Sequence, residues 1–315
     1  MDRRSPNPAW RGELYAALAA MGYGSAYVAT AFALRSFDPL PIAAYRSLLA
    51  GLALAALIAI RRRRARPRDG GGVAPAARPG RYLRLVVVGI LGGPIFLAGM
   101  NFAVAGVGAT IASFVAGLYA ILAAVLAPFL LREPLRPRAL AGFVIALAGT
   151  ALLAELDLGS PGRSGIAWGL LAAVSFALFL VLSRKWAGPD GFDGLAVALS
   201  TMGSAAIGLG ALIAISAPAS FSPATLAPEA LVALAWLAVV AASGQALAVS
   251  SLRLVPASRT AAFLLLNPIT AAVLSALLLA QVPTGLQLVG GVLVLAGIAA
   301  ATVELPRGRG LSSPG

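Results

Sequence analysis

"LYAILAAVLAPFLLREPL", residues 118–135, aligns without a gap against "LNPITAAVLSALLLAQVP", residues 266–283, at a constant shift of 148 residues. The same shift continues through "LAGFVIALAGTALL" at 140–153 and "LVGGVLVLAGIAAA" at 288–301. A weaker match joins "GELYAALAAMGYG", which begins at Gly12, to "GIAWGLLAAVSFA", which begins at Gly165. The chain is therefore predicted to contain two copies of one apolar unit.

The composition predicts an integral membrane protein. Hydrophobic residues make up 60% of the chain and charged residues 11%, whereas soluble domains contain about 25% charged residues. Runs without polar alternation indicate transmembrane helices rather than barrel strands. Apolar runs long enough to cross a bilayer lie near 12–34, 40–60, 84–104, 109–131, 138–154, 165–183, 194–216, 229–251, 258–280 and 284–303.

These runs predict the fold class, an all-α integral membrane protein with ten transmembrane helices. They divide into two five-helix units, 12–154 and 165–303. Because five is odd, the second unit enters the membrane from the opposite side, which makes an inverted repeat with a pseudo-two-fold axis in the membrane plane. Such repeats are typical of secondary transporters, in which rocking of one half against the other exposes a central site alternately to each side.

The charges predict the orientation. With the N-terminus inside, 21 of the 24 Lys and Arg residues fall on the inner side and 2 on the outer side. The positive-inside rule then places both termini in the cytoplasm, with cytoplasmic tails at 1–11 and 304–315. The Arg- and Gly-rich segment 61–83 is expected to be a cytoplasmic loop, better explained by topology than by binding of anionic lipid. The excess of arginine over lysine suggests a GC-rich bacterial genome.

Missing residue types exclude several kinds of chemistry. The chain contains no Cys and no His, so no cofactor or metal site based on those side chains is expected. The net charge of +13 does not predict a nucleic-acid partner, because the arginines flank apolar segments. No acidic residue lies in mid-span, which gives no support for a carboxylate proton relay. A membrane-embedded enzyme would need a cluster of acids that the sequence lacks.

Polar and aromatic side chains within the spans are the candidate site residues. Such groups usually face a bundle interior or a water-filled cavity. Asn101 and Gln245 occupy comparable places in the two units, and either cavity lining or interhelical hydrogen bonding would explain them. The other predicted substrate-binding residues are the repeat partners Tyr119 and Asn267, and the mid-depth repeat partners Tyr23 and Phe176.

Arg46 is the one Lys or Arg residue that the orientation count assigns to neither side, because it lies within the apolar part of a span. It follows Pro41 by five residues, about 7.5 Å along a helix, so it could snorkel to the outer surface. Its other predicted partners are the outer acids Asp38 and Glu155, backbone carbonyls at a helix end, or an anionic group of a solute. "FDPLPIAAYR" from Phe37 resembles "FDGLAVALST" from Phe192, which makes Thr201 the repeat counterpart of Arg46. The charge therefore belongs to one unit only, and we include Arg46 among the substrate-binding candidates.

Four glycines predict close helix packing. Gly142 and Gly149 in one unit, and Gly290 and Gly297 in the other, are seven residues apart and fall near one helical face. Small residues at that spacing let two helices approach closely. The spans near 138–154 and 284–303 are therefore expected to form tight contacts.

The motif order resembles that of a known family. "SFDPLPIAAYRSLLAG" at 36–51, "REPLRPRALAGFVIALAGTALL" at 132–153 and "SLRLVPASRTAAFLLLNPITAAVLSALLLAQ" at 251–281 look like the EamA family of the drug/metabolite transporter superfamily. The resemblance covers nearly the whole chain. It implies a basket of ten helices in the inner membrane, with a central cavity lined by spans 1 to 4 and 6 to 9.

The resemblance also implies a function, usually export of amino acids or other small metabolites. The alternatives are a lipid-carrier or nucleotide-sugar transporter of the same superfamily and, less favoured, a lipid-modifying enzyme. One departure is Gln281, where members often have a glutamate that matches Glu133. The expected partners are a small-molecule substrate and the lipid bilayer, and the sequence leaves open whether the chain forms a homodimer.

Overall fold

The computed structural model describes residues 9–64, 79–131, 137–153, 162–186, 194–216, 227–254, 263 and 266–302. These residues are helical apart from short turns, and none of them forms a strand. The helices are α1 (Ala9–Ala33), α2 (Pro39–Arg64), α3 (Pro79–Ile90), the π-helical segment η1 (Leu91–Ile95), α4 (Phe96–Gly117), α5 (Tyr119–Leu131), α6 (Pro137–Leu153), α7 (Gly162–Lys185), α8 (Gly194–Ser216), α9 (Pro228–Leu254), α11 (Leu266–Leu279) and α12 (Gly285–Thr302).

The lengths of the helices agree with a multi-pass membrane protein. Within the described ranges, six helical stretches are long and apolar enough to cross a bilayer, and three shorter apolar helices accompany them. One stretch, Gly80–Leu131, is 52 residues long, or about 78 Å if straight, which is more than twice the thickness of the hydrocarbon core. Gly108 interrupts it with a φ of 76°, a conformation that favours glycine. This break coincides with the gap predicted between the third and fourth spans, although ten crossings stay a prediction.

A second break lies within the same stretch. Gly93 has non-helical φ and ψ angles of −101° and −105° inside η1, and Pro94 follows it. Proline lacks the N–H that the preceding turn needs, and it commonly kinks a helix. A β-carbon on Gly93 would collide with the carbonyl oxygen of Thr201, so the kink brings the backbone of η1 directly against α8.

Both ends of the expected loop at 61–83 are helical. α2 continues through Arg64 and α3 already begins at Pro79, because a helix can extend beyond the hydrocarbon as long as its backbone hydrogen bonds remain satisfied. Residues 65–78 lie outside the described residues, as do most residues of the two predicted tails.

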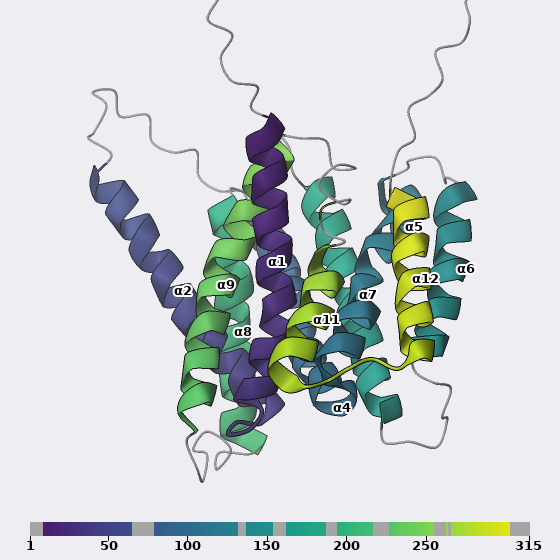
Figure 1. Ribbon diagram of the computed structural model, residues 1–315. Helices are drawn as coiled ribbons and strands as arrows, with labels where there is room; N and C mark the ends of the chain where they lie inside the picture. The colour runs from purple at the N-terminus through teal and green to yellow at the C-terminus, as the bar shows by residue number, and fades with distance from the viewer. Residues whose placement is uncertain are drawn as a thin grey trace, which may run out of the picture.

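Helix pairing relates the two units by approximate symmetry. α1 packs on α9 and α11, while the equivalent helix α7 packs on α4 and α5. α2 packs on α8, and α6 packs on α12. α1 begins and α12 ends on the same side of the bundle, at the top of Figure 1. These contacts between the units therefore have counterparts when the units are exchanged.

The α6–α12 pair reveals the relative direction of the units. A β-carbon on Gly149 would lie 2.6 Å from the carbonyl oxygen of Gly290, and one on Gly297 would lie 2.5 Å from that of Gly142. The predicted close packing at these four glycines is confirmed. Gly149, the later glycine of α6, meets Gly290, the earlier glycine of α12, and the other two glycines meet in the same way. α6 and α12 are therefore antiparallel. This is the direction that an inverted repeat requires of its two last helices.

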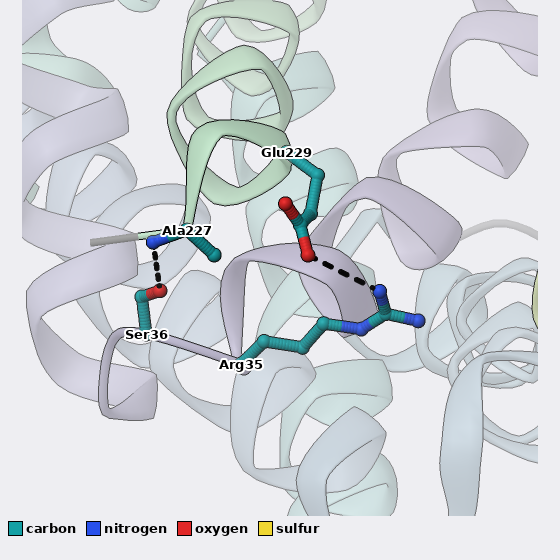
Figure 2. Close-up of polar contacts among 4 residues, drawn as sticks. All are labelled: Arg35, Ser36, Ala227 and Glu229. Atoms are coloured by element: carbon teal, nitrogen blue, oxygen red, sulfur yellow. Dashed lines mark hydrogen bonds and ion pairs between the residues drawn. The ribbon is translucent and has the colours of Figure 1, made fainter. Parts of the chain in front are cut away.

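Polar contacts attach the turn after α1 to the start of α9 (Figure 2). Arg35 Nη1 lies 3.4 Å from Glu229 Oε1, and the two side chains are 50% and 46% exposed. Beside this pair, the backbone N–H of Ala227 donates to Ser36 Oγ at 3.0 Å. The guanidinium of Arg35 also lies 4.6 Å from the ring centroid of Phe32.

We expect Glu229→Gln to lower the free energy of unfolding by less than about 1 kcal/mol, because an exposed ion pair is screened by water and salt. Melting curves of purified protein at low and high salt would measure it, and high salt should remove the difference between the variant and the wild type. Ser36→Ala is the comparison, because it removes a hydrogen bond between neutral groups. Its free energy of unfolding should fall by about 1 kcal/mol, and this loss should persist in salt. A salt-independent loss in Glu229→Gln larger than that of Ser36→Ala would contradict this expectation.

Candidate substrate cavity

A cavity lies at the centre of the bundle, between the two units. Its volume is about 60 Å³, counted as space open to the centre of a water molecule, which is room for roughly four waters. Helices of both units line it, whereas α6 and α12 contribute no lining residue. The lining residues are Tyr23, Ala26, Tyr27, Arg46, Gly92, Phe96, Leu97, Met100, Tyr119, Phe176, Met202, Leu237, Val240, Ala241 and Asn267.

The cavity brings together most of the side chains proposed from sequence. Five of the seven candidates line it: Tyr23, Arg46, Tyr119, Phe176 and Asn267. They come from α1, α2, α5, α7 and α11, so residues more than 240 positions apart in the chain meet in one place.

Arg46 is the cation of the cavity. Its side chain comes from α2 and is 3% exposed, so it does not snorkel to the surface. Nε and Nη2 are buried without a hydrogen-bond partner. Within the described part of the chain, Arg46 has no ion pair and Asp38 is exposed. The other predicted acid, Glu155, lies outside the described residues. A buried cation without a partner is costly, which makes Arg46 the chemically distinctive group of the cavity.

Aromatic rings form one wall. The ring centroid of Phe176 lies 4.4 Å from that of Phe96 and 5.2 Å from that of Phe179. Tyr119 meets Phe176 edge-on at 4.9 Å. Offset and edge-to-face arrangements at these distances are favourable. The sequence prediction included Phe176 and Tyr119 but omitted Phe96, an apolar residue with no polar or repeat signal.

Close packing of α1 on α11 positions two further polar side chains. Asn267 is 4% exposed and its Oδ1 has no hydrogen-bond partner. A β-carbon on Gly24 would collide with the carbonyl oxygen of Asn267, so only glycine lets α1 come this near. Tyr23 lies against Gly244 of α9, where a β-carbon would be 2.6 Å from Cε1 of the ring. Glycines thus determine how closely the helices surround the cavity.

Asn101, another predicted site residue, lies outside the cavity. It is fully buried and Nδ2 donates to the carbonyl oxygen of Pro39 at 2.8 Å, at the first residue of α2. It does not line the cavity, and its hydrogen bond is of the interhelical kind that the sequence left as an alternative. The side chain of Gln245, on α9, lies outside the described residues. Thr201, the repeat counterpart of Arg46, donates from Oγ1 to the carbonyl oxygen of Ala198 at 2.9 Å.

Sequence reasoning did not select several lining residues. Tyr27 is 2% exposed and follows Tyr23 by one helical turn, so the i, i+4 spacing of two tyrosines was a usable signal. Met100 and Met202, one from each unit, also line the cavity. Among so many apolar residues, no pattern distinguishes a methionine that faces a cavity from one that faces a neighbouring helix.

Comparisons with known proteins agree with this architecture. The model of the EamA-like transporter family matches the chain twice, at residues 10–154 and 163–303. A solved crystal structure shares the fold with a TM-score of 0.63 at 19% sequence identity, over 92% of this chain and 97% of its own. No curated protein matches closely enough to count as a relative.

The two family matches begin close to the starts of the two predicted units and together span nearly the whole chain. The apolar helices make it a multi-pass membrane protein. Membership accounts for a repeated unit, an all-helical bundle and a central cavity in one chain, and the family is one of transporters rather than enzymes. The chain therefore belongs to the EamA-like transporter family, within the drug/metabolite transporter superfamily.

Proposed function

We propose that the protein is a secondary transporter that exports a small metabolite, such as an amino acid or a related solute, by alternating access. The observation that supports this most is the position of the cavity, because both repeats line it. Rocking of one repeat against the other would change which side of the membrane can reach the cavity.

The proposal includes ten crossings and a bacterial inner membrane, with both termini in the cytoplasm. The break at Gly108 supports two crossings within the long stretch from α3 to α5. The excess of Lys and Arg on the inner side supports the orientation. The cavity then lies within the membrane, where an exported solute would bind from the cytoplasm.

Transport measurements with a blocked cavity would test the proposal. Everted vesicles containing the wild-type protein should accumulate at least one solute from a panel of labelled amino acids and organic acids. Ala241→Leu adds three carbons at the cavity wall and should reduce that uptake at least tenfold.

Ala235→Leu is the matched control. It makes the same substitution on the same helix at an exposed position, so uptake should remain near the wild-type rate. If both variants transport equally well, or if no solute of the panel moves, the proposed route through the cavity is wrong.

A further inference from the structure

We propose that the cavity selects a carboxylate anion without a positive charge, such as a 2-hydroxy acid, over the zwitterionic amino acid of the same carbon skeleton. This inference rests on the proposed transport function and specifies its substrate class. Three features of the cavity support it: the unpartnered edge of Arg46, a described lining that includes no acid, and the free acceptor of Asn267.

The two unpartnered nitrogens of Arg46 occupy the same edge of the guanidinium. Nε–H and one Nη2–H point in nearly parallel directions, and together they match the two oxygens of a carboxylate. Both atoms are buried without a hydrogen-bond partner, and Arg46 lines the cavity. A carboxylate bound to this edge would satisfy both donors and neutralise the charge.

Among the residues that the structure describes, no acidic side chain lines the cavity. Of the three described acids, Glu229 pairs with Arg35 at the bundle surface, Asp38 is exposed next to the start of α2, and Glu13 lies near the start of α1. The polar lining groups besides Arg46 are the phenols of Tyr23, Tyr27 and Tyr119 and the amide of Asn267, and all are uncharged at neutral pH.

The charge balance then distinguishes two classes of ligand. A monoanion bound by Arg46 leaves the site neutral, whereas a zwitterion leaves one positive charge uncompensated. In a 2-amino acid the ammonium is also attached next to the carboxylate, so it would lie near the guanidinium and be repelled by it. The aromatic rings of the cavity would attract the ammonium group, but its repulsion by the guanidinium of Arg46 opposes this attraction.

Asn267 supplies a second point of recognition. Its Oδ1 is buried without a donor, and a buried acceptor gains from a hydrogen bond that replaces the one lost to water. A hydroxyl group can donate to it without bringing a charge. A carboxylate with a neighbouring hydroxyl therefore suits both Arg46 and Asn267.

Ligands of one carbon skeleton give the sharpest test. Purified protein at pH 7 would be titrated with lactate, alanine and lactamide, and in parallel with 2-hydroxy-4-methylpentanoate and leucine, while its melting temperature is recorded. A ligand that binds the folded state raises the melting temperature according to its affinity. We expect at least one hydroxy acid to bind ten or more times more tightly than its amino acid, and lactamide to produce no shift.

Variants of Arg46 separate binding from folding. Arg46→Gln should lose the shift caused by the hydroxy acid, yet its ligand-free melting temperature should equal or exceed that of the wild type, because an unpartnered buried cation is removed. Arg46→Lys keeps the charge but not the two-pronged edge, and its affinity should fall at least tenfold. Arg35→Gln, which removes an exposed arginine, should bind like the wild type.

Several results would overturn the proposal. Binding of the amino acid as tightly as the hydroxy acid would refute the selectivity, and so would the absence of binding by every compound. A ligand-free melting temperature of Arg46→Gln well below that of the wild type would assign Arg46 a structural role. Uptake of amino acids into everted vesicles in any of these cases would leave the transport function intact and refute only the substrate class.

Discussion

Replacing Gly24 with alanine is expected to lower the free energy of unfolding by about 2–3 kcal/mol, the upper range for overpacking of a tight interior. The added β-carbon would collide with the carbonyl oxygen of Asn267 and lie 2.7 Å from Cβ of Thr270. Neither a backbone oxygen nor a β-carbon can rotate away. α1 and α11 must therefore separate, which also moves Tyr23 and Asn267 apart in the cavity.

The measurement is a melting curve in detergent together with transport of whichever solute the vesicle assay identifies. Gly203→Ala is the matched control, since a β-carbon on Gly203 of α8 meets nothing within 4 Å. Its stability should stay the same or rise slightly, because alanine favours a helix more than glycine does. Equal melting temperatures for the two variants would show that α1 and α11 do not pack as closely as described.

Phe176→Ala is expected to have a similar or larger effect, about 3 kcal/mol, the lower range for removing a large aromatic side chain from a packed interior. Its ring contacts Phe96, Tyr119 and Phe179, and all these contacts are lost together. The cavity should widen on the side of α7. We therefore expect the variant to be less stable and to bind its solute more weakly.

Phe129→Ala provides the control for this loss. Phe129 is 73% exposed on α5, so the same truncation removes contacts with lipid or detergent rather than with the cavity wall. Melting temperatures and solute affinity of both variants would be compared with those of the wild type. If Phe129→Ala is as destabilising as Phe176→Ala, or if the affinity of Phe176→Ala is unchanged, the aromatic wall does not have the assigned role.

Much of the architecture could be predicted because it depends on local properties of the sequence, such as the length of its apolar runs and the spacing of its small residues. Apolar runs must form helices in lipid, since the backbone has no other hydrogen-bond partner there. The repeat showed which helices are equivalent, and the seven-residue spacing of Gly142 and Gly149, and of Gly290 and Gly297, predicted that their two helices pack closely. These predictions needed no knowledge of which helix lies beside which.

The site was predictable only in part. Polar residues in mid-span are costly, which selected Arg46 and Asn267, and both line the cavity. The same reasoning selected Asn101, which instead donates to the carbonyl of Pro39. A polar side chain can satisfy its hydrogen bonds in a cavity or on a neighbouring helix, and the cost of burial alone does not distinguish the two.

By itself, the sequence determined that the protein lies in a membrane, that it is all-helical and that it contains a repeat. These properties follow from hydrophobicity and periodicity, which can be summed along the chain without knowing its tertiary contacts. Only the tertiary structure decided that Arg46 faces a central cavity with Nε and Nη2 unpartnered, rather than snorkelling to the surface. It also placed Phe96, Tyr27 and two methionines around the same space. The physical reason is that the direction of a side chain depends on helix rotation and on close approach at residues such as Gly24, and both depend on contacts between segments far apart in the chain.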